Sequence, residues 1–91
     1  MIGIVDYGVG NLFSLRSSLA MIGADAVVSS DAAVLRRADR LILPGVGAFG
    51  DAAAKLRASG LDRVVTAQAQ AGTPVMGICL GMQLLFDRGL E

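Results

Sequence analysis

Histidine and tryptophan are absent from this 91-residue sequence, and cysteine occurs once, at Cys79. A single cysteine excludes an internal disulfide, which is consistent with a reducing cytoplasm. The absence of histidine excludes a complete Ser-His or Cys-His catalytic pair within these residues, and it also excludes an imidazole metal site. We therefore expect no metal and no cofactor.

Charged residues are scarce, at 18% of the chain, and their charges cancel to a net charge of zero. This balance excludes a basic nucleic-acid-binding surface and an acidic disordered tail. No apolar run approaches the ~20 residues that a membrane span needs. The N-terminus has no basic segment and Asp6 interrupts its apolar stretch, so it resembles neither a signal peptide nor an anchor. We expect a cytoplasmic protein without nucleic-acid or membrane partners.

Hydrophobic residues are abundant, at 54% of the chain, which excludes a disordered protein. The length fits one small domain or part of a larger one. A domain this short buries only about 60–65% of its unfolded surface, so a free-standing domain should carry more charge than this one does. We expect the chain to pack against something else or to be the front part of a larger domain.

Four short apolar runs are typical of strands buried on both faces of a parallel sheet. They span residues 1–6, 25–29, 40–43 and 74–78. Helical patterns lie between and after them. Asn11 and Asp31 are candidate N-caps for the first two helices. The later helices are expected over residues 52–58, where Asp51 marks the start, and over residues 61–71 and 80–87. The order βαβαβααβα predicts an α/β fold with a doubly wound, flavodoxin-like parallel sheet, incomplete at the C-terminus.

The most informative segment is Gly77-Ile78-Cys79-Leu80-Gly81, where an expected strand runs directly into the cysteine and a helix follows. It matches the G-x-nucleophile-x-G elbow, with cysteine where hydrolases place serine. A helix N-terminus favours the thiolate and lowers the pKa of the thiol. The backbone N–H of Leu80 is placed to donate to an oxyanion. A lone cysteine is usually a small buried hydrophobe, but the flanking glycines favour a nucleophile here.

A second glycine-rich turn, Pro44-Gly45-Val46-Gly47-Ala48-Phe49-Gly50, follows the third expected strand. It contains the dinucleotide-binding pattern G-x-G-x-x-G, but that pattern belongs after a first strand, and the next strand here ends in Cys79 rather than an acidic ribose ligand. Two other interpretations are open. The turn is an ordinary glycine-rich loop, or it is an oxyanion strand in which residues 45–47 expose backbone amides. If the third and fourth strands are neighbours, these amides face Cys79.

A third turn, Asp6-Tyr7-Gly8-Val9-Gly10-Asn11, follows the first expected strand. Phe13 stands where a dinucleotide-binding turn would have its third glycine, so that function is not supported. A helix cap explains Asn11 at least as well as a contact role.

Together, the three turns resemble the class I (triad-type) glutamine amidotransferases, and more narrowly the glutaminase subunits of imidazole glycerol phosphate synthases. The narrow resemblance rests on residues 6–12, 43–49 and 77–83, in this order and spacing, and it covers the whole chain. Many amidotransferases share the cysteine elbow, whereas the first motif separates these subunits from the anthranilate, GMP and pyridoxal phosphate relatives. The resemblance implies that residues 1–91 form the N-terminal part of a single glutamine amidotransferase domain.

The resemblance also implies a mechanism. Cys79 would attack the side-chain amide of glutamine, form a γ-glutamyl thioester and release ammonia, and water would then release glutamate. The implied oxyanion and substrate-binding residues are Gly45, Val46, Gly47, Leu80 and Gln83, of which Gln83 would hold glutamine. Asn11 would lie near the interface with a cyclase subunit, a (β/α)₈ barrel through which ammonia passes in histidine biosynthesis.

Members of this family complete the triad with a histidine and a glutamate late in the chain, and this sequence has no histidine. We therefore expect no glutaminase activity from these 91 residues alone. The alternatives are another cysteine-elbow α/β protein, either a different class I amidotransferase or a DJ-1-like protein with Asp6 near the thiol. A further alternative is a non-catalytic nucleotide-binding module built on residues 45–50.

Overall fold

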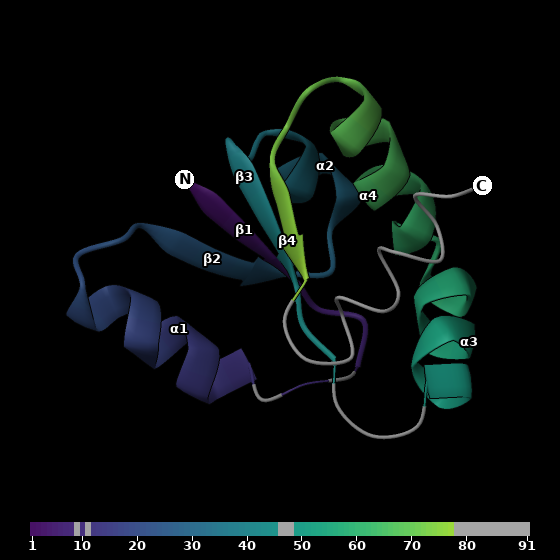
Figure 1. Ribbon diagram of the computed structural model, residues 1–91, viewed down its shortest axis with the longest axis horizontal. Coiled ribbons are helices and arrows are strands. Elements are labelled where there is room, and N and C mark those ends of the chain that lie inside the picture. The colour runs from purple at the N-terminus through teal and green to yellow at the C-terminus, as the bar shows by residue number, and fades with distance from the viewer. Residues whose placement is uncertain (9, 11, 46–48, 78–91) are drawn as a thin grey trace.

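A computed structural model describes residues 1–8, 10, 12–45 and 49–77, which form a parallel β-sheet flanked by helices (Figure 1). The elements are β1 (Ile2–Val5), α1 (Leu12–Met21), β2 (Ala26–Ser29), α2 (Ala32–Arg36), β3 (Arg40–Leu43), α3 (Phe49–Ser59), α4 (Leu61–Gln70) and β4 (Val75–Gly77). The expected order of elements is confirmed over these residues. The helix expected over residues 80–87 lies outside them.

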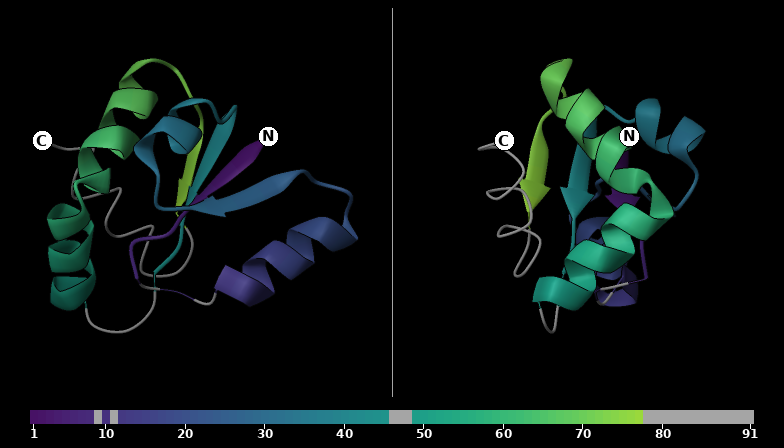
Figure 2. Two further views of the ribbon diagram at one scale, coloured as in Figure 1. Left: turned by 180° about the vertical axis from the view of Figure 1, so that it is seen from behind. Right: turned by 90° about the vertical axis from the view of Figure 1, so that its right-hand side faces the viewer.

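The sheet has the strand order β2-β1-β3-β4, and every neighbouring pair is parallel. This order confirms the doubly wound α/β fold, because the chain leaves β1 in one direction to reach β2 and crosses back past β1 to reach β3. Right-handed crossovers then place α1 on one face of the sheet and the later helices on the other. Figures 1 and 2 show α1 set apart beside β2, away from α2, α3 and α4.

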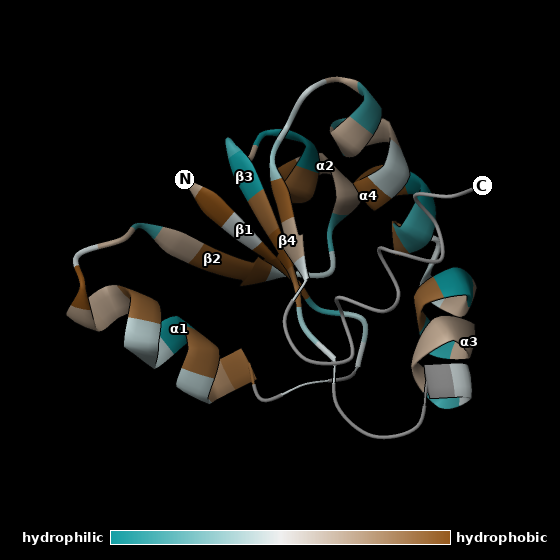
Figure 3. Ribbon diagram, viewed as in Figure 1, coloured by the Kyte–Doolittle hydropathy of each residue, from teal (hydrophilic) through white to brown (hydrophobic). Residues whose placement is uncertain are grey.

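The main hydrophobic core lies between the sheet and helices α2, α3 and α4. From the two central strands, Val5, Leu41 and Leu43 enter it, each at most 1% exposed. The helices contribute Leu35, Ala52, Leu56, Leu61, Val64 and Val65. Figure 3 shows the corresponding hydropathy pattern, with apolar strands and mixed helices. Burying one such Leu or Val side chain stabilises the fold by about 1.5–3 kcal/mol, so this layer dominates stability.

The opposite face of the sheet is covered unevenly in the described part of the chain. Ile4, Ile42 and Met76 form a registered row across β1, β3 and β4, and their exposure rises from 0% to 6% to 61%. Helix α1 packs beside β2, at the far end of this row from β4. The apolar surface of this face is therefore buried at β1 and β3 and exposed at β4.

Two helix starts test the sequence predictions. Asp31 caps α2 as expected, since its Oδ1 accepts a hydrogen bond from the N–H of Ala33 at 2.9 Å. Helix α3 begins at Phe49, two residues before the expected start at Asp51. Asp51 therefore lies in the first turn of α3 rather than at the N-cap. Its negative charge is stabilised there by the positive end of the helix dipole.

Gly3 lets α2 and the residues after it approach the sheet closely. A Cβ atom added at Gly3 would lie 3.0 Å from the Cβ of Ala38 and 3.0 Å from Cδ2 of Leu41. Both neighbours are buried, so they have little room to move aside. Glycine in this strand is explained by packing.

We predict that Gly3→Ala lowers the free energy of unfolding by about 1–3 kcal/mol, because it overpacks the contact between β1 and α2. Urea denaturation of the 91-residue protein measures the change. Gly50→Ala is the matched control, because Gly50 lies in α3 and an added Cβ meets no atom within 4 Å in the part of the chain that the structure describes. Alanine in that helix should be neutral or stabilising by up to about 1 kcal/mol. Equal effects at both positions would contradict the packing explanation.

Tyr7 belongs to the same core and is 5% exposed. Burial raises the pKa of Tyr7 above its ordinary value of 10.0, so the folded protein holds the phenolic proton more tightly than the unfolded chain does. The stability that this provides is fully present below the ordinary pKa of tyrosine. It is lost as the pH rises through the folded-state pKa.

We predict that the tyrosinate absorbance of the folded protein rises at a higher pH than that of free tyrosine. The titration reports Tyr7 alone, because the sequence has one tyrosine and no tryptophan. In parallel, the wild-type protein should lose stability above pH ~10 relative to Tyr7→Phe. A titration at the pKa of free tyrosine would contradict the burial of this side chain.

Candidate functional site

The carboxyl ends of the strands meet at one edge of the sheet, which is where ligands bind in open α/β folds. At this edge, β1 continues into Asp6 and Tyr7, and β3 continues into Pro44 and Gly45. Strand β4 ends at Gly77, which is paired with Leu43 of β3. The condition stated for an oxyanion strand, that the third and fourth strands are neighbours, is therefore met. The two strands therefore end side by side at this edge.

Of the site residues predicted from the sequence, the structure describes Gly45, which is buried directly after Pro44. The remaining predicted site residues lie outside the described part of the chain: Asn11, Val46, Gly47, Cys79, Leu80 and Gln83. Their placement stays a prediction. The described residues nevertheless define the framework from which these segments leave the sheet.

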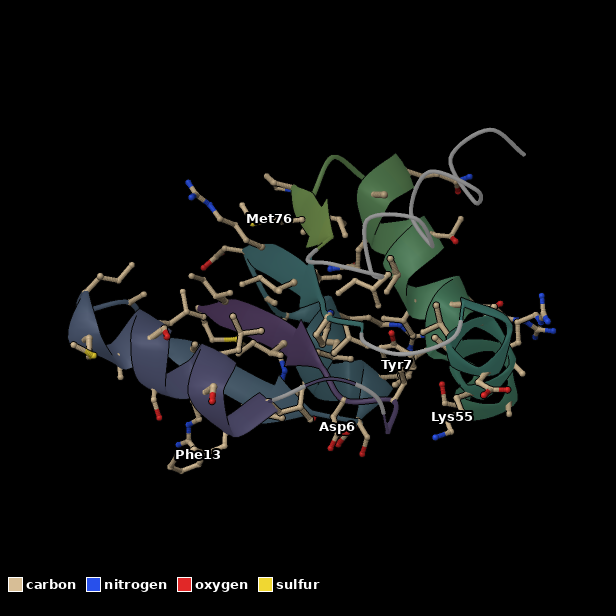
Figure 4. All side chains as sticks on the ribbon, turned by 60° about the horizontal axis from the view of Figure 1, so that its bottom comes forward. Asp6, Tyr7, Phe13, Lys55 and Met76 are labelled. Carbon is tan, nitrogen blue, oxygen red and sulfur yellow. The ribbon has the colours of Figure 1, made fainter. Side chains whose placement is uncertain are left out.

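The turn after β1 has defined geometry. The N–H of Asp6 donates to the carbonyl of Ser29 at 3.0 Å, which extends the pairing of β1 with β2. The carboxylate of Asp6 then accepts from the N–H of Gly8 at 3.3 Å, as in an Asx turn. Gly8 and Gly10 both have positive φ angles, of 89° and 106°, which favour glycine. Asp6 points outward and Tyr7 inward (Figure 4).

Tyr7 joins the first turn to the second. Its hydroxyl donates a buried hydrogen bond to the carbonyl oxygen of Pro44, 37 residues further along the chain. Sequence reasoning missed this role for Tyr7, which it treated only as part of a motif. The available signal was a tyrosine directly after a buried strand, because a buried phenol needs a hydrogen-bond partner.

Gly10 makes a second contact between the two turns. A Cβ atom added there would lie 2.9 Å from the Cβ of Pro44 and 3.7 Å from the backbone nitrogen of Gly45. Only a residue without a side chain allows this approach. The first glycine-rich turn therefore packs directly on the start of the second, although the sequence presents them as separate features.

The described residues at this edge contribute backbone structure to a site rather than reactive side chains. Within residues 1–8, 10, 12–45 and 49–77, no group of three or more His, Cys, Asp or Glu side chains is arranged to hold a metal ion. None of the helices in this part of the chain is long and apolar enough to cross a membrane. What the edge offers is the backbone of two adjoining turns, held in place by Tyr7 and Gly10.

Curated relatives match the chain along its whole length. The imidazole glycerol phosphate synthase subunit HisH of Symbiobacterium thermophilum is 56% identical over 88 residues, which is 97% of this chain and 42% of that protein. The subunit of the same name from Geobacillus thermodenitrificans is 52% identical over 91 residues, which is 100% of this chain and 43% of that protein. The chain thus spans less than half the length of these relatives.

A solved structure described as a glutamine amidotransferase has the same fold. It superposes with a TM-score of 0.73 at 22% sequence identity, over 88% of this chain and 42% of that one. This likeness confirms the predicted fold class.

A family model supplies the remaining comparison. Residues 4–89 match the model of the CobB/CobQ-like glutamine amidotransferase domain, and this match favours neither a DJ-1-like protein nor a nucleotide-binding module. The chain belongs to this family of glutamine amidotransferase domains.

Proposed function

We propose that this chain is the N-terminal, nucleophile-bearing part of a glutaminase subunit of imidazole glycerol phosphate synthase. The observation that carries the proposal is the match to HisH subunits at 48–56% identity over nearly all of the chain. The proposed activity is hydrolysis of glutamine to glutamate and ammonia.

The arrangement of β3 and β4 supports the proposed site. Because Leu43 is paired with Gly77, the residues two positions further on are Gly45 and Cys79. Two parallel neighbouring strands that leave the sheet at the same level would bring the thiol close to the backbone of residues 45–47. This is the arrangement that an oxyanion hole needs, with donors about 3 Å from the developing charge.

In the proposed reaction, the thiolate of Cys79 attacks the side-chain carbonyl carbon of glutamine. The negative charge on the tetrahedral oxygen is stabilised by the amides of Gly45, Val46 and Gly47, together with the amide of Leu80. The C–N bond then breaks and ammonia leaves with a proton from a general acid. Water cleaves the γ-glutamyl thioester and releases glutamate, while Gln83 holds the substrate.

The proton donor must come from outside these residues. The sequence contains no histidine, so the general acid and base would be supplied by a further histidine and glutamate, as in triad amidotransferases. We propose that residues 1–91 are the first part of one amidotransferase domain. Its partner would be a (β/α)₈-barrel cyclase subunit that receives the ammonia, with Asn11 near the interface, in a cytoplasmic heterodimer.

We predict that a chimera restores glutaminase activity. The chain is joined, where the alignment ends, to the C-terminal part of the Symbiobacterium thermophilum relative and is co-purified with a cyclase subunit. Ammonia release from glutamine should then be measurable, and Cys79→Ser should reduce kcat by about 10³-fold or more. Equal rates in the chimera and in Cys79→Ser would contradict the proposed role of this cysteine.

We predict that a glutamine analogue with an electrophilic side chain inactivates the same chimera by forming one covalent adduct on Cys79. Peptide mass spectrometry locates the adduct, and excess glutamine should protect against it. A compound with the same electrophilic group but without the amino-acid head group is the matched control and should react much more slowly. Labelling at the same rate with and without glutamine would indicate that Cys79 is an exposed thiol rather than part of a glutamine site.

We predict that the 91-residue chain alone releases no ammonia from glutamine above background, because it has no histidine to donate a proton to the leaving group. A coupled glutamate assay checks this expectation. Activity of the isolated chain that disappears in Cys79→Ser would show that these residues contain a complete catalytic centre.

A further inference from the structure

We infer that Tyr7 and Gly10 are positioning residues that fix the peptide unit between Pro44 and Gly45 at the start of the proposed oxyanion strand. The inference rests on the proposed function and adds two residues to it. Neither residue contacts the reacting atoms in this account. Both act through Pro44.

Tyr7 controls the direction of the Gly45 amide. The carbonyl of Pro44 and the N–H of Gly45 belong to one peptide unit, which is planar, and no described peptide bond is cis. In a trans peptide, the C=O and N–H groups point in opposite directions. A buried hydroxyl that holds the carbonyl oxygen of Pro44 therefore also fixes the Gly45 N–H, which points away from Tyr7.

Gly10 controls the position of the same peptide unit. Its backbone lies against the ring of Pro44, so a Cβ atom there would clash with that ring at 2.9 Å and would touch the nitrogen of Gly45 at 3.7 Å. The pyrrolidine ring restricts φ of Pro44, and this makes the contact stiff. Tyr7 thus sets the orientation of the peptide plane and Gly10 sets its distance from the first turn.

Small displacements of this unit should affect the reaction strongly. Oxyanion donors act over about 2.7–3.1 Å, and a misplacement of about 1 Å can cost about 10²-fold in rate. The charge that these donors stabilise develops in the transition state. Loss of positioning should therefore lower kcat and leave KM nearly unchanged.

The test uses the active chimera in complex with the cyclase subunit. We expect Tyr7→Phe and Gly10→Ala each to lower kcat by about ten- to a hundredfold, with KM within about twofold of wild type. Gly8→Ala is the matched control, because Gly8 has a similar positive φ of 89° but an added Cβ meets no atom of the described residues within 4 Å. It carries the same backbone strain without contacting Pro44, so its kcat should stay within about twofold of wild type.

A spectroscopic measurement reports the contact independently of catalysis. Residues 1–91 contain two prolines, so labelling the proline carbonyl carbons of this segment alone in the chimera gives one NMR signal for each. The Pro44 carbonyl accepts from Tyr7, whereas the Pro74 carbonyl accepts from the N–H of Leu41 at 2.9 Å. Tyr7→Phe should shift the Pro44 signal and leave the Pro74 signal in place, which also shows that the sheet remains folded.

The outcomes separate the inference from the proposed function. An active wild-type chimera with unchanged kcat in Tyr7→Phe and Gly10→Ala overturns the inference and leaves the function standing. An unmoved Pro44 signal in Tyr7→Phe overturns it as well, as does a kcat loss in Gly8→Ala equal to that in Gly10→Ala. A folded wild-type chimera without glutaminase activity overturns the proposed function, and the inference with it.

Discussion

The parallel pairing of β3 with both β1 and β4 is the constraint on which the rest of this structure depends. It places Ile4 beside Ile42 and Leu43 beside Gly77, so three strands end at one edge in a fixed register. A slip by one residue would turn Leu41 and Leu43 away from the core and would also misalign the turns that leave the sheet. The hydrophobic layer beneath α2, α3 and α4 therefore fixes the candidate site as well as the fold.

The second level of organisation is the contact between turns. Residues far apart in the sequence meet at this edge, with Tyr7 bonded to the Pro44 carbonyl and Gly10 packed on the Pro44 ring. Breaking this hydrogen bond would leave the buried carbonyl of Pro44 without a partner, and an unsatisfied buried polar group costs about 1–3 kcal/mol. The first turn is therefore a rigid support for the second. In the proposed glutaminase, such a support would keep backbone donors aligned before substrate arrives, so that no reorganisation is needed during the reaction.

Much of the fold could be predicted because it depends on local patterns. Apolar runs gave the four strands nearly residue by residue, and Asp31 was identifiable as a cap from its chemistry alone. The start of α3 could not be placed, because Gly50 lowers helix propensity and Asp51 suits a first turn as well as a cap. The Tyr7–Pro44 bond could not be predicted either. It depends on which strands are neighbours, and single-sequence patterns do not encode that. The role of Cys79 was assigned from its motif and stays a prediction.

The central claim is that residues following β3 and β4 form one glutaminase centre, with the thiol of Cys79 facing the backbone of residues 45–47. A crystal structure of the assembled subunit with a glutamine-derived adduct tests it most directly. The account predicts that the adduct lies on Cys79, with its carbonyl oxygen about 3 Å from a backbone amide of residues 45–47. A Cys79 sulfur more than about 10 Å from that backbone, beyond the reach of any hydrogen bond to an adduct oxygen, would contradict it.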